Sequence, residues 1–340
     1  MNYLELANSV LEGHVITRDE ALAMMAVPDE EVSQLLEGAL VLRERHFGRD
    51  VRVHVLQNAK SGACPEDCTF CSQSVRYPSP VERYKTQTVD ELMAGARAAY
   101  EAGAVTYCMV TATRHPSERD LDALCDAVER IKSELPLKIC TSLGLLTEQK
   151  AARLAAAGVD RYNHNLESSQ DYFPELVTTH EWSDRQDTIR AARGAGMEAC
   201  AGGILGMGES LEDRVDLALS LRELGVESIP VNLLDPRPGT PLGDKTRMEI
   251  SDALRGLAMF RFIHPSKEIR IAGGREAVLR ERQADGLKAA NSIFSNGYLT
   301  TPGQSASTDQ ELLETNGFRA VLVDEFPPAT ASARSDATHA

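Results

Sequence analysis

Residues 88–110, TVDELMAGARAAYEAGAVTYCMV, contain one complete helix pattern followed directly by a strand pattern, and they indicate the fold class. Thr88 is a favourable N-cap, acidic residues follow it in the first turn, and Gly103 stands just past the last helical position. The apolar run 104–110 that comes next is typical of a buried strand. A helix that ends at glycine and passes straight into a buried strand is the repeating unit of an α/β fold.

The same helix-to-strand junction recurs along the chain, as AGVD at 157–160, AGME at 195–198 and LGVE at 224–227. A helical pattern follows each of the first seven strand candidates. The eight strand candidates are residues 51–57, 104–110, 137–141, 159–165, 197–202, 226–232, 267–273 and 291–295. This alternation predicts an α/β (βα)8 barrel of the TIM type. A doubly wound open sheet is the alternative that the alternation also allows.

The remaining segments are expected to form extensions of one barrel. Residues 1–48 contain two amphipathic helical patterns, 17–26 and 29–48, which predict an N-terminal helical cap. The barrel is expected over residues 49–305 and a C-terminal extension over 306–340. From about residue 327 the sequence PPATASARSDATHA has no large apolar residue, so we expect a disordered tail there.

Composition excludes several classes of protein. The chain has 51 acidic and 36 basic residues, a formal charge of −15 and no Lys/Arg-rich run, which argues against a nucleic-acid partner. No apolar stretch reaches the roughly 18 residues that a membrane span requires, and the N-terminus does not resemble a signal peptide. An odd number of cysteines, seven, without an export signal predicts reduced thiols and a cytoplasmic protein.

Three of the seven cysteines, Cys64, Cys68 and Cys71, stand in SGACPEDCTFCSQS at 61–74, in the loop after the first strand. In a TIM barrel the loops after the strands form the active face. A structural zinc site needs four ligands, so His54 or a distant cysteine would have to complete one, and the chain has no second C-x2-C pair. Three thiolates on an iron–sulfur cluster instead leave one iron open, as a catalytic site requires.

The pattern C-x3-C-x-aromatic-C, formed by Cys64, Cys68, Phe70 and Cys71, resembles the motif of the radical S-adenosylmethionine (SAM) enzymes. The resemblance implies a [4Fe-4S] cluster whose open iron binds SAM, with Phe70 near the adenine. The segment GGILGMGE at 202–209 is similar to the G-x-I-x-G-x-x-E pattern that lines the SAM site in this family. The matching residues are Gly202, Ile204, Gly206 and Glu209. Taken alone, the segment is equally a strand-to-helix turn whose glycines serve the backbone.

Cys108, Cys140 and Cys200 each fall within a different predicted strand. A single buried cysteine is usually a small apolar packing residue, and we expect this role for Cys125, which lies in a helical pattern. Inward-facing positions on neighbouring barrel strands converge on one interior, however, so three such cysteines could hold a second cluster. A [2Fe-2S] cluster would require a fourth ligand.

Further segments extend the resemblance over residues 35–305 and point to the sulfur-inserting members of the radical SAM family; they are YNHNLES, GMGE, GTPL, IRIAGGRE and ANSIFSNGYLTTPG. In those members a [2Fe-2S] cluster is held by three strand cysteines and one arginine. The resemblance therefore implies that Cys108, Cys140, Cys200 and Arg270 are its ligands. Without the resemblance, an arginine in a strand would be interpreted as an ion-pair partner or a substrate anchor.

Polar residues alternate along the fourth predicted strand, where Asn163, Asn165 and Glu167 share one face. Polar side chains on a buried strand need hydrogen-bond partners. The resemblance implies contacts from this segment to the SAM ribose and to the ureido ring of the substrate. We expect SAM contacts from Asn165 and Glu167 and substrate contacts from Asn163, Asn165 and Asn232, with His164 on the opposite face.

The resemblance implies that SAM is cleaved reductively, that the resulting radical removes hydrogen from dethiobiotin, and that the [2Fe-2S] cluster donates sulfur to form biotin. It also implies an electron donor of flavodoxin or ferredoxin type, iron–sulfur assembly proteins and a homodimer. One alternative is another radical SAM enzyme, of the hydrogenase-maturation or pyrrolysine-pathway type, which is not expected to carry the second ligand set. Another is an iron–sulfur or zinc protein without radical activity, which would leave GGILGMGE and the asparagines without a role.

Overall fold

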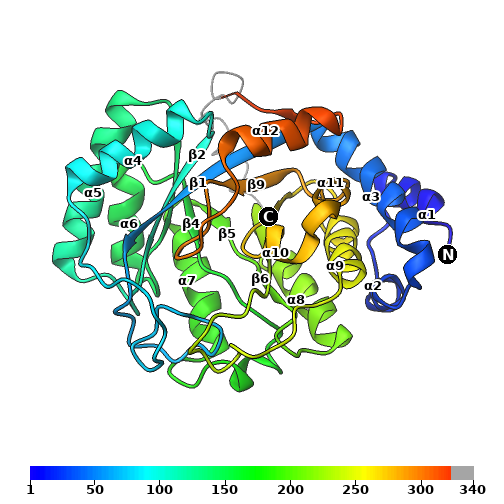
Figure 1. Cartoon of the computed structure of the whole chain (residues 1–340), viewed down its shortest axis with the longest axis horizontal. Helices are drawn as coiled ribbons and strands as arrows, with labels where there is room; N and C mark the ends of the chain where they lie inside the picture. The colour runs from blue at the N-terminus through cyan, green and yellow to red at the C-terminus, as the bar shows by residue number, and fades with distance from the viewer. Residues whose placement is uncertain (323–340) are drawn as a thin grey trace, which may run out of the picture.

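Eight parallel strands that close on themselves lie at the centre of the molecule (Figure 1). The computed structural model describes residues 1–322. The barrel strands are β1 (Asp50–Lys60), β2 (Thr106–Thr111), β3 (Lys138–Ser142), β4 (Arg161–Asn163), β5 (Glu198–Cys200), β7 (Ser228–Leu233), β8 (Glu268–Ile271) and β9 (Ser292–Ser295). Each strand pairs in parallel with the next, and β9 returns to pair with β1. This closure confirms the predicted TIM-type barrel and shows that the open doubly wound alternative is wrong.

Helices cover the outside of the barrel and alternate with its strands (Figure 1). They are α4 (Val89–Glu101), α5 (Glu118–Glu134), α6 (Glu148–Ala157), α7 (Trp182–Gly194), α8 (Leu211–Glu223) and α9 (Ile250–Ile263), with the 3-10 helix η2 (Phe173–Glu175) before α7. The helical pattern that follows the seventh strand candidate is divided into α10 (Arg275–Leu279), η3 (Arg280–Arg282) and α11 (Gln283–Gly286). The division falls at Arg280, whose φ of +48° cannot continue a right-handed helix.

Local signals explain where these helices begin and end. Thr88 and Ser210 each accept a hydrogen bond from the third helical residue and complete a capping box. α6 ends at Gly158, whose φ of +102° is the left-handed conformation that favours glycine. The Ser117 side chain caps α5 by accepting from the Asp120 amide, and Pro116 stands directly before this cap.

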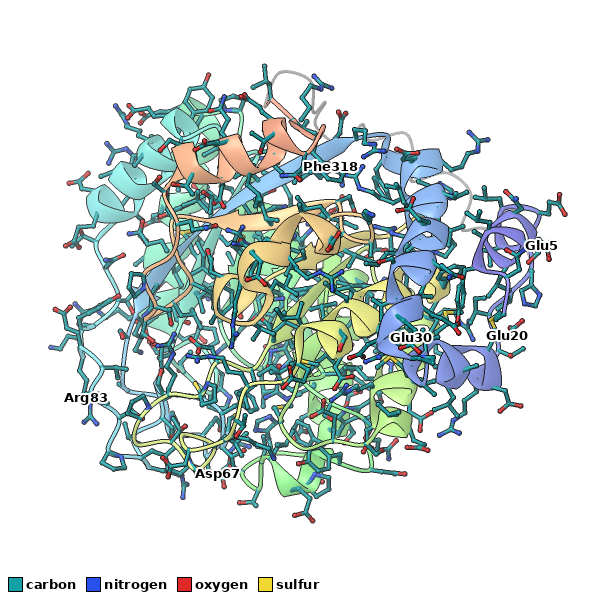
Figure 2. All side chains as sticks on the ribbon, turned by 45° about the vertical axis from the view of Figure 1, so that its right-hand side comes forward. Glu5, Glu20, Glu30, Asp67, Arg83 and Phe318 are labelled. Atoms are coloured by element: carbon teal, nitrogen blue, oxygen red, sulfur yellow. The ribbon has the colours of Figure 1, made fainter. Side chains whose placement is uncertain are left out.

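The N-terminal segment packs beside the barrel. The predicted helical patterns become α2 (Arg18–Met25), the short 3-10 helix η1 (Asp29–Glu31) and α3 (Val32–Phe47). A further helix that was not predicted, α1 (Tyr3–Leu11), precedes them and packs on α3. α2 and α3 contact α9, so this segment covers one side of the barrel (Figure 1). Glu5, Glu20 and Glu30 mark that side in Figure 2.

The C-terminal extension returns to the start of the barrel. α12 (Ala306–Thr315) was not predicted, and it leads into β10 (Arg319–Ala320), which pairs with Asp50 and Val51 of β1. The tail predicted to be disordered from about residue 327 lies outside the described residues. None of the helices within residues 1–322 is both long and apolar enough to cross a membrane.

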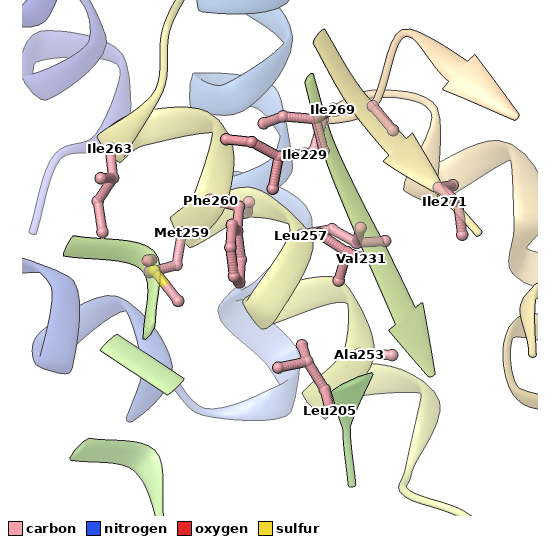
Figure 3. Packing of buried hydrophobic residues seen from close by; sticks show 14 of the residues in the cluster. Leu205, Ile229, Val231, Ala253, Leu257, Met259, Phe260, Ile263, Ile269 and Ile271 are labelled. Carbon is pink, nitrogen blue, oxygen red and sulfur yellow. The ribbon is translucent and has the colours of Figure 1, made fainter. Parts of the chain in front are cut away.

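Apolar packing between the barrel and α9 forms a large part of the core (Figure 3). Leu257 and Phe260 of α9 lie against Val231 of β7 and against Ile269 and Ile271 of β8, and all five side chains are buried. Each side chain of this size contributes roughly 1.5–3 kcal/mol when it leaves water. The helix layer therefore fixes the positions of the strands that carry the polar residues of the interior.

Candidate active site

A cavity of about 370 Å³ opens at the carboxyl ends of the barrel strands. This is the face where the loop after β1 lies, as the barrel predicts. In Figure 2 Asp67 of that loop and Phe318, which precedes β10, lie at opposite edges of the molecule. The predicted site residues that line the cavity are Cys64, Cys68, Phe70, Cys71, Cys108, Cys140, Asn163, Asn165, Glu167, Ile204, Asn232 and Arg270.

The cysteine triplet is held by the backbone of its own loop. The Cys71 amide donates to the Cys68 carbonyl at 3.0 Å, and the Cys64 amide donates to the Gln73 carbonyl at 3.2 Å. Burial raises the pKa of the Cys64 thiol to about 11 and also raises the pKa values of Cys68 and Cys71. The three thiols are therefore neutral until a metal centre displaces their protons.

The side chains of the triplet are not arranged as a site for a single metal ion. Within residues 1–322, no group of three or more His, Cys, Asp and Glu side chains is arranged to hold one ion. His54, the residue considered as a fourth zinc ligand, is fully buried in β1, and six residues of extended chain, about 20 Å, separate it from the end of that strand. The zinc hypothesis therefore gains no support from the geometry.

The three strand cysteines converge beneath the cavity. Cys108 and Cys140 are direct partners in the register of β2 and β3. The Cys140 thiol is within hydrogen-bonding reach of both the Cys108 and the Cys200 thiols. All three are buried, and Cys200 itself does not line the cavity. A second group of thiols thus lies inside the barrel, apart from the triplet on the loop.

Arg270 of β8 reaches this second group. Its Nη1 donates to Cys200 Sγ at 3.8 Å, while its Nε donates to Ser292 Oγ at 2.9 Å. Its Nη2 donates to Ser228 Oγ at 3.0 Å and to the Glu268 carboxylate. Burial alone would lower the pKa of Arg270, but the neighbouring Glu268 carboxylate and the cysteines outweigh burial and raise it. The guanidinium is therefore positively charged in the protein as described.

A buried ionic network fills the barrel below Arg270. Glu268 accepts hydrogen bonds from Arg52 at 2.9 Å and from Arg161 at 3.0 Å, and Arg161 also pairs with Glu198 at 2.6 Å. Burial would raise the pKa of Glu268, but the arginines hold it well below its usual range. Each of the two carboxylates is thus paired with at least one buried arginine, which offsets the cost of burying the charges.

A row of polar side chains leads from the inner thiols toward the loop. Asn163 Nδ2 donates to Cys200 Sγ at 3.3 Å and to Asn165 Oδ1 at 3.3 Å. Asn165 Nδ2 donates to Glu167 Oε2 at 3.4 Å. Glu167 has a φ of +70°, and burial raises the pKa of its carboxyl group. His164, expected on the opposite face, also borders the cavity because β4 ends at Asn163.

Arg185 continues this row, and sequence reasoning missed it. Its Nη1 donates to Glu167 Oε1 at 3.5 Å and its Nη2 to Cys68 Sγ at 3.9 Å. Polar contacts thus connect the inner cysteine group to the loop triplet. The sequence contains only a weak indication of a functional role for Arg185. It occupies the same face of α7 as the buried Trp182 and Ile189, where an apolar residue is normal.

The glycines and Glu209 of the segment 202–209 determine the conformation of its backbone. A Cβ atom on Gly202 would stand 1.9 Å from the Pro230 carbonyl oxygen, so only glycine fits there. Gly206 has a φ of +94°. Glu209 accepts hydrogen bonds from the Gly206 amide at 2.7 Å and the Gly208 amide at 2.9 Å. Of this segment's predicted residues, Ile204 lines the cavity, whereas Gly202, Gly206 and Glu209 shape the turn beside it.

The amide of Asn232 also bridges two backbone segments. Its Oδ1 accepts from the Gly273 amide at 2.9 Å, and its Nδ2 donates to the Gly203 carbonyl at 3.1 Å. A carboxamide has one further acceptor position and one further donor hydrogen. Asn232 therefore stays available to a molecule in the cavity while its orientation is fixed.

A parallel barrel with a cysteine loop at its open end, facing an interior cavity, defines a radical SAM enzyme. Residues 59–221 match the family described as "Radical SAM superfamily", and residues 230–319 match the "Biotin and Thiamin Synthesis associated domain". The radical SAM match implies a [4Fe-4S] cluster and SAM as cofactors. Solved structures share the fold: methylornithine synthase (PylB) superimposes with a TM-score of 0.82 at 19% identity, over 94% of this chain and 98% of that one. The hydrogenase maturase HydG from Carboxydothermus hydrogenoformans gives 0.78 at 18% identity, over 94% and 79%.

Sequence relatives give the narrower family. The chain is 54% identical to the biotin synthase of Salinibacter ruber, over 98% of this chain and 93% of that protein. It is 49% identical to the biotin synthase of Rhodopirellula baltica, over 93% and 88%, and 45% identical to that of Bacillus subtilis strain 168, over 98% and 99%. The chain belongs to the biotin synthase family. This confirms the predicted resemblance and favours it over the hydrogenase-maturation and pyrrolysine-pathway alternatives. The solved structures of those two types share only the fold with this chain.

Proposed function

We propose that this protein inserts sulfur into dethiobiotin to form biotin, the last step of biotin biosynthesis. The observation that carries the proposal is one cavity with two separate cysteine groups, on the loop and inside the barrel, joined by a row of polar side chains. The loop cysteines alone would account only for the cluster that initiates the radical reaction. The second group would hold the cluster that donates sulfur, at the inner end of the cavity.

The proposed ligands follow from these positions. Cys64, Cys68 and Cys71 would hold a [4Fe-4S] cluster, and Cys108, Cys140, Cys200 and Arg270 would hold a [2Fe-2S] cluster. When bound, these groups together with SAM supply the radical that removes hydrogen from an unactivated carbon and the sulfur that replaces it. The proposed surroundings of SAM are Phe70, Asn165, Glu167, Gly202, Ile204, Gly206 and Glu209.

The chain's own share of the reaction is to orient the substrate. Dethiobiotin carries a ureido ring with N–H donors and a carbonyl acceptor, and carboxamides complement both. Asn163, Asn165 and Asn232 each present such an amide to the cavity. Because their amides are already held by hydrogen bonds, little conformational entropy is lost when the ring binds.

A second role of the chain in the reaction is to exclude water from the cavity. Residues 298–303, between β9 and α12, line the cavity. Ser72 Oγ of the cysteine loop lies 3.2 Å from Thr300 Oγ1, and Arg237 donates to Thr301 Oγ1 at 2.5 Å. These contacts join the loop after β9 to the cysteine loop and to the loop after β7. A closed interior protects a reactive intermediate from solvent.

Other features of the protein are part of the same proposal. Reduction of the loop cluster requires a one-electron donor, for which we propose a flavodoxin or ferredoxin, and iron–sulfur assembly proteins would supply the clusters. We further propose a homodimer in the cytoplasm. The proposed domains are a helical cap at 1–48, the catalytic barrel at 49–305 and a C-terminal extension at 306–340.

Anaerobic reconstitution with iron and sulfide, followed by metal analysis and Mössbauer spectroscopy, tests the two cluster sites. We expect about six irons per chain, divided between cubane and [2Fe-2S] signals. Four irons and no [2Fe-2S] signal would contradict the proposal. A Cys64→Ala variant is expected to lose SAM cleavage and to keep the [2Fe-2S] signal.

Mass spectrometry tests the reaction itself. Dethiobiotin, SAM and a reductant should yield biotin together with 5′-deoxyadenosine. Formation of 5′-deoxyadenosine without biotin would indicate a radical SAM enzyme with another substrate. Formation of neither product by a protein that holds both clusters would contradict the proposed activity.

A further inference from the structure

Two acidic residues between the first two cysteines tie the cysteine loop to the segment before α7. Asp67 Oδ1 accepts hydrogen bonds from the Thr178 amide at 3.0 Å and the Thr179 amide at 3.3 Å. Glu66 Oε2 lies 2.5 Å from His180 Nδ1. The loop that carries the triplet is therefore anchored to a segment more than 100 residues away.

The direction of hydrogen bonding at His180 is fixed by its second neighbour. His180 Nε2 lies 3.0 Å from Arg185 Nε. An arginine Nε carries a hydrogen and cannot accept, so His180 Nε2 must be the acceptor. The imidazole proton is then on Nδ1, which donates to the Glu66 carboxylate. Glu66, His180 and Arg185 therefore form a chain in which the donor and the acceptor of both hydrogen bonds at His180 are assigned.

This chain is buried and sterically confined. The residues Glu66, His180 and Arg185 are 6%, 8% and 6% exposed. The Phe173 ring packs edge-on to the imidazole at 5.6 Å between centroids and lies 5.3 Å from the guanidinium carbon of Arg185. Burial lowers the pKa of His180, in agreement with a neutral imidazole. The guanidinium is thus held on one edge by His180 and on one face by an aromatic ring.

The remaining edge of the guanidinium points at the cysteine triplet. Nη1 donates to the Asn165 carbonyl at 2.8 Å, and Nη2 donates to Cys68 Sγ at 3.9 Å. Cys68 is the one buried member of the triplet. A fixed positive charge with an N–H directed at this sulfur stabilises the more negative state of any centre bound there.

We propose that His180 is a positioning residue that aims Arg185 at the Cys68 sulfur and thereby raises the reduction potential of the loop cluster. The inference rests on the proposed function, because it requires a [4Fe-4S] cluster on the triplet. Arg185 reaches the cluster ligand itself, whereas His180 and Glu66 act through Arg185. A higher potential makes uptake of an electron by this cluster easier, and makes the later transfer of that electron to SAM less favourable by the same amount.

The test is an EPR-monitored redox titration of the reconstituted full-length protein without SAM, with iron content measured in parallel. His180→Leu removes the acceptor for Arg185, and His180→Gln restores one acceptor and one donor. We expect the equilibrium constant for reduction of the loop cluster to fall about tenfold in His180→Leu. For a one-electron couple this corresponds to a reduction potential lower by about 59 mV. In His180→Gln the equilibrium constant for reduction of the loop cluster should return to within about threefold of the wild-type value.

Arg190→Gln is the matched control, because Arg190 lies on the exposed side of the same helix and pairs only at the surface with Asp187, at 2.8 Å. It should keep the wild-type potential. Equal potentials in all variants would overturn the inference and leave the proposed function intact.

If His180→Leu loses its cluster, the reduction potential of the Arg185→Gln variant tests the inference instead. A lowered potential in Arg185→Gln supports the inference, and a wild-type potential overturns it. Loss of the cluster from both variants would assign these residues to folding of the loop and overturn the tuning role. A wild-type protein without a [4Fe-4S] signal would overturn the proposed function as well.

Discussion

Cys108 and Cys140 lie directly opposite each other on the adjacent parallel strands β2 and β3. Neighbouring strands are about 4.8 Å apart, so the sheet itself sets the spacing of these two thiols. Cys200 joins them from β5 through its contact with Cys140. The barrel strands therefore place all three sulfur atoms without the help of a loop.

Cys140→Ser should remove the [2Fe-2S] signal and preserve the cubane, because Cys140 is central to the inner group and distant in sequence from the loop triplet. We expect about four irons per chain in place of six by metal analysis and Mössbauer spectroscopy. Cys125→Ser is the control, since Cys125 lies half-buried on α5 near the Arg153 carbonyl and should keep both signals. Loss of both clusters in Cys140→Ser would contradict the assignment of two separate sites.

Glu268→Gln should destabilise the protein strongly, because it leaves Arg52, Arg161 and Arg270 without the carboxylate that they share. Removing one partner of a buried ion pair typically costs about 3–5 kcal/mol. Urea denaturation of the cluster-free protein measures this change. Glu37→Gln is the control: Glu37 pairs with Lys288 at the surface, at 2.6 Å, and its loss should cost less than about 1 kcal/mol. Equal costs for the two variants would contradict the role assigned to the network.

The barrel was predictable because its signals are local. Caps such as Thr88 and stops such as Gly158 lie within a few residues of the elements that they delimit. β-branched residues mark several of the barrel strands, whereas β5 (EAC) has none and follows from the glycine stop before it. α1 and α12 were missed because short helices at the ends of a chain have few periodic positions. The extra strand β10 has two residues and depends on pairing with β1, which no local pattern shows.

The site was predictable only in part. Cysteine is a distinctive residue type, so the positions of the seven cysteines along the chain already predict one group of thiols on the loop and another on the strands. Arg185, His180 and Glu268 were missed because their partners are remote: Glu66 and His180 are 114 positions apart, and Arg161 and Glu268 are 107 apart. A charged residue in a helix or strand gives no local sign of which distant group it will meet.

Gly202→Ala tests whether the glycines of 202–209 are required by the backbone alone. The new methyl group would collide with the Pro230 carbonyl oxygen, so we expect the cluster-free protein to lose about 1–3 kcal/mol of stability without any SAM present. Gly194→Ala is the control, because nothing lies within 4 Å of its Cβ position at the end of α7. That change should be neutral or stabilising by up to about 1 kcal/mol. Unchanged stability in Gly202→Ala, with weakened SAM binding, would instead favour a direct role at the cofactor.

His264 should make the stability of the cluster-free protein depend on pH. Burial lowers the pKa of His264 to about 3, and its Nε2 donates to the Ala218 carbonyl at 3.0 Å. An exposed histidine in the unfolded chain has a pKa near 6.5. Between these two values the unfolded state binds a proton that the folded state does not, so stability falls as the pH falls from about 6.5 toward 3.

His264→Gln keeps a donor for the Ala218 carbonyl and cannot titrate. Below pH 6.5 the unfolding free energy of the wild type should therefore fall by about 1.4 kcal/mol more per pH unit than that of the variant. Urea denaturation between pH 4.5 and 8 measures both slopes, and above pH 7 the two proteins should have the same pH dependence, which serves as the internal control. Parallel curves over the whole range would mean that His264 has the same pKa in the folded and unfolded states, which would contradict the effect of burial against Phe260.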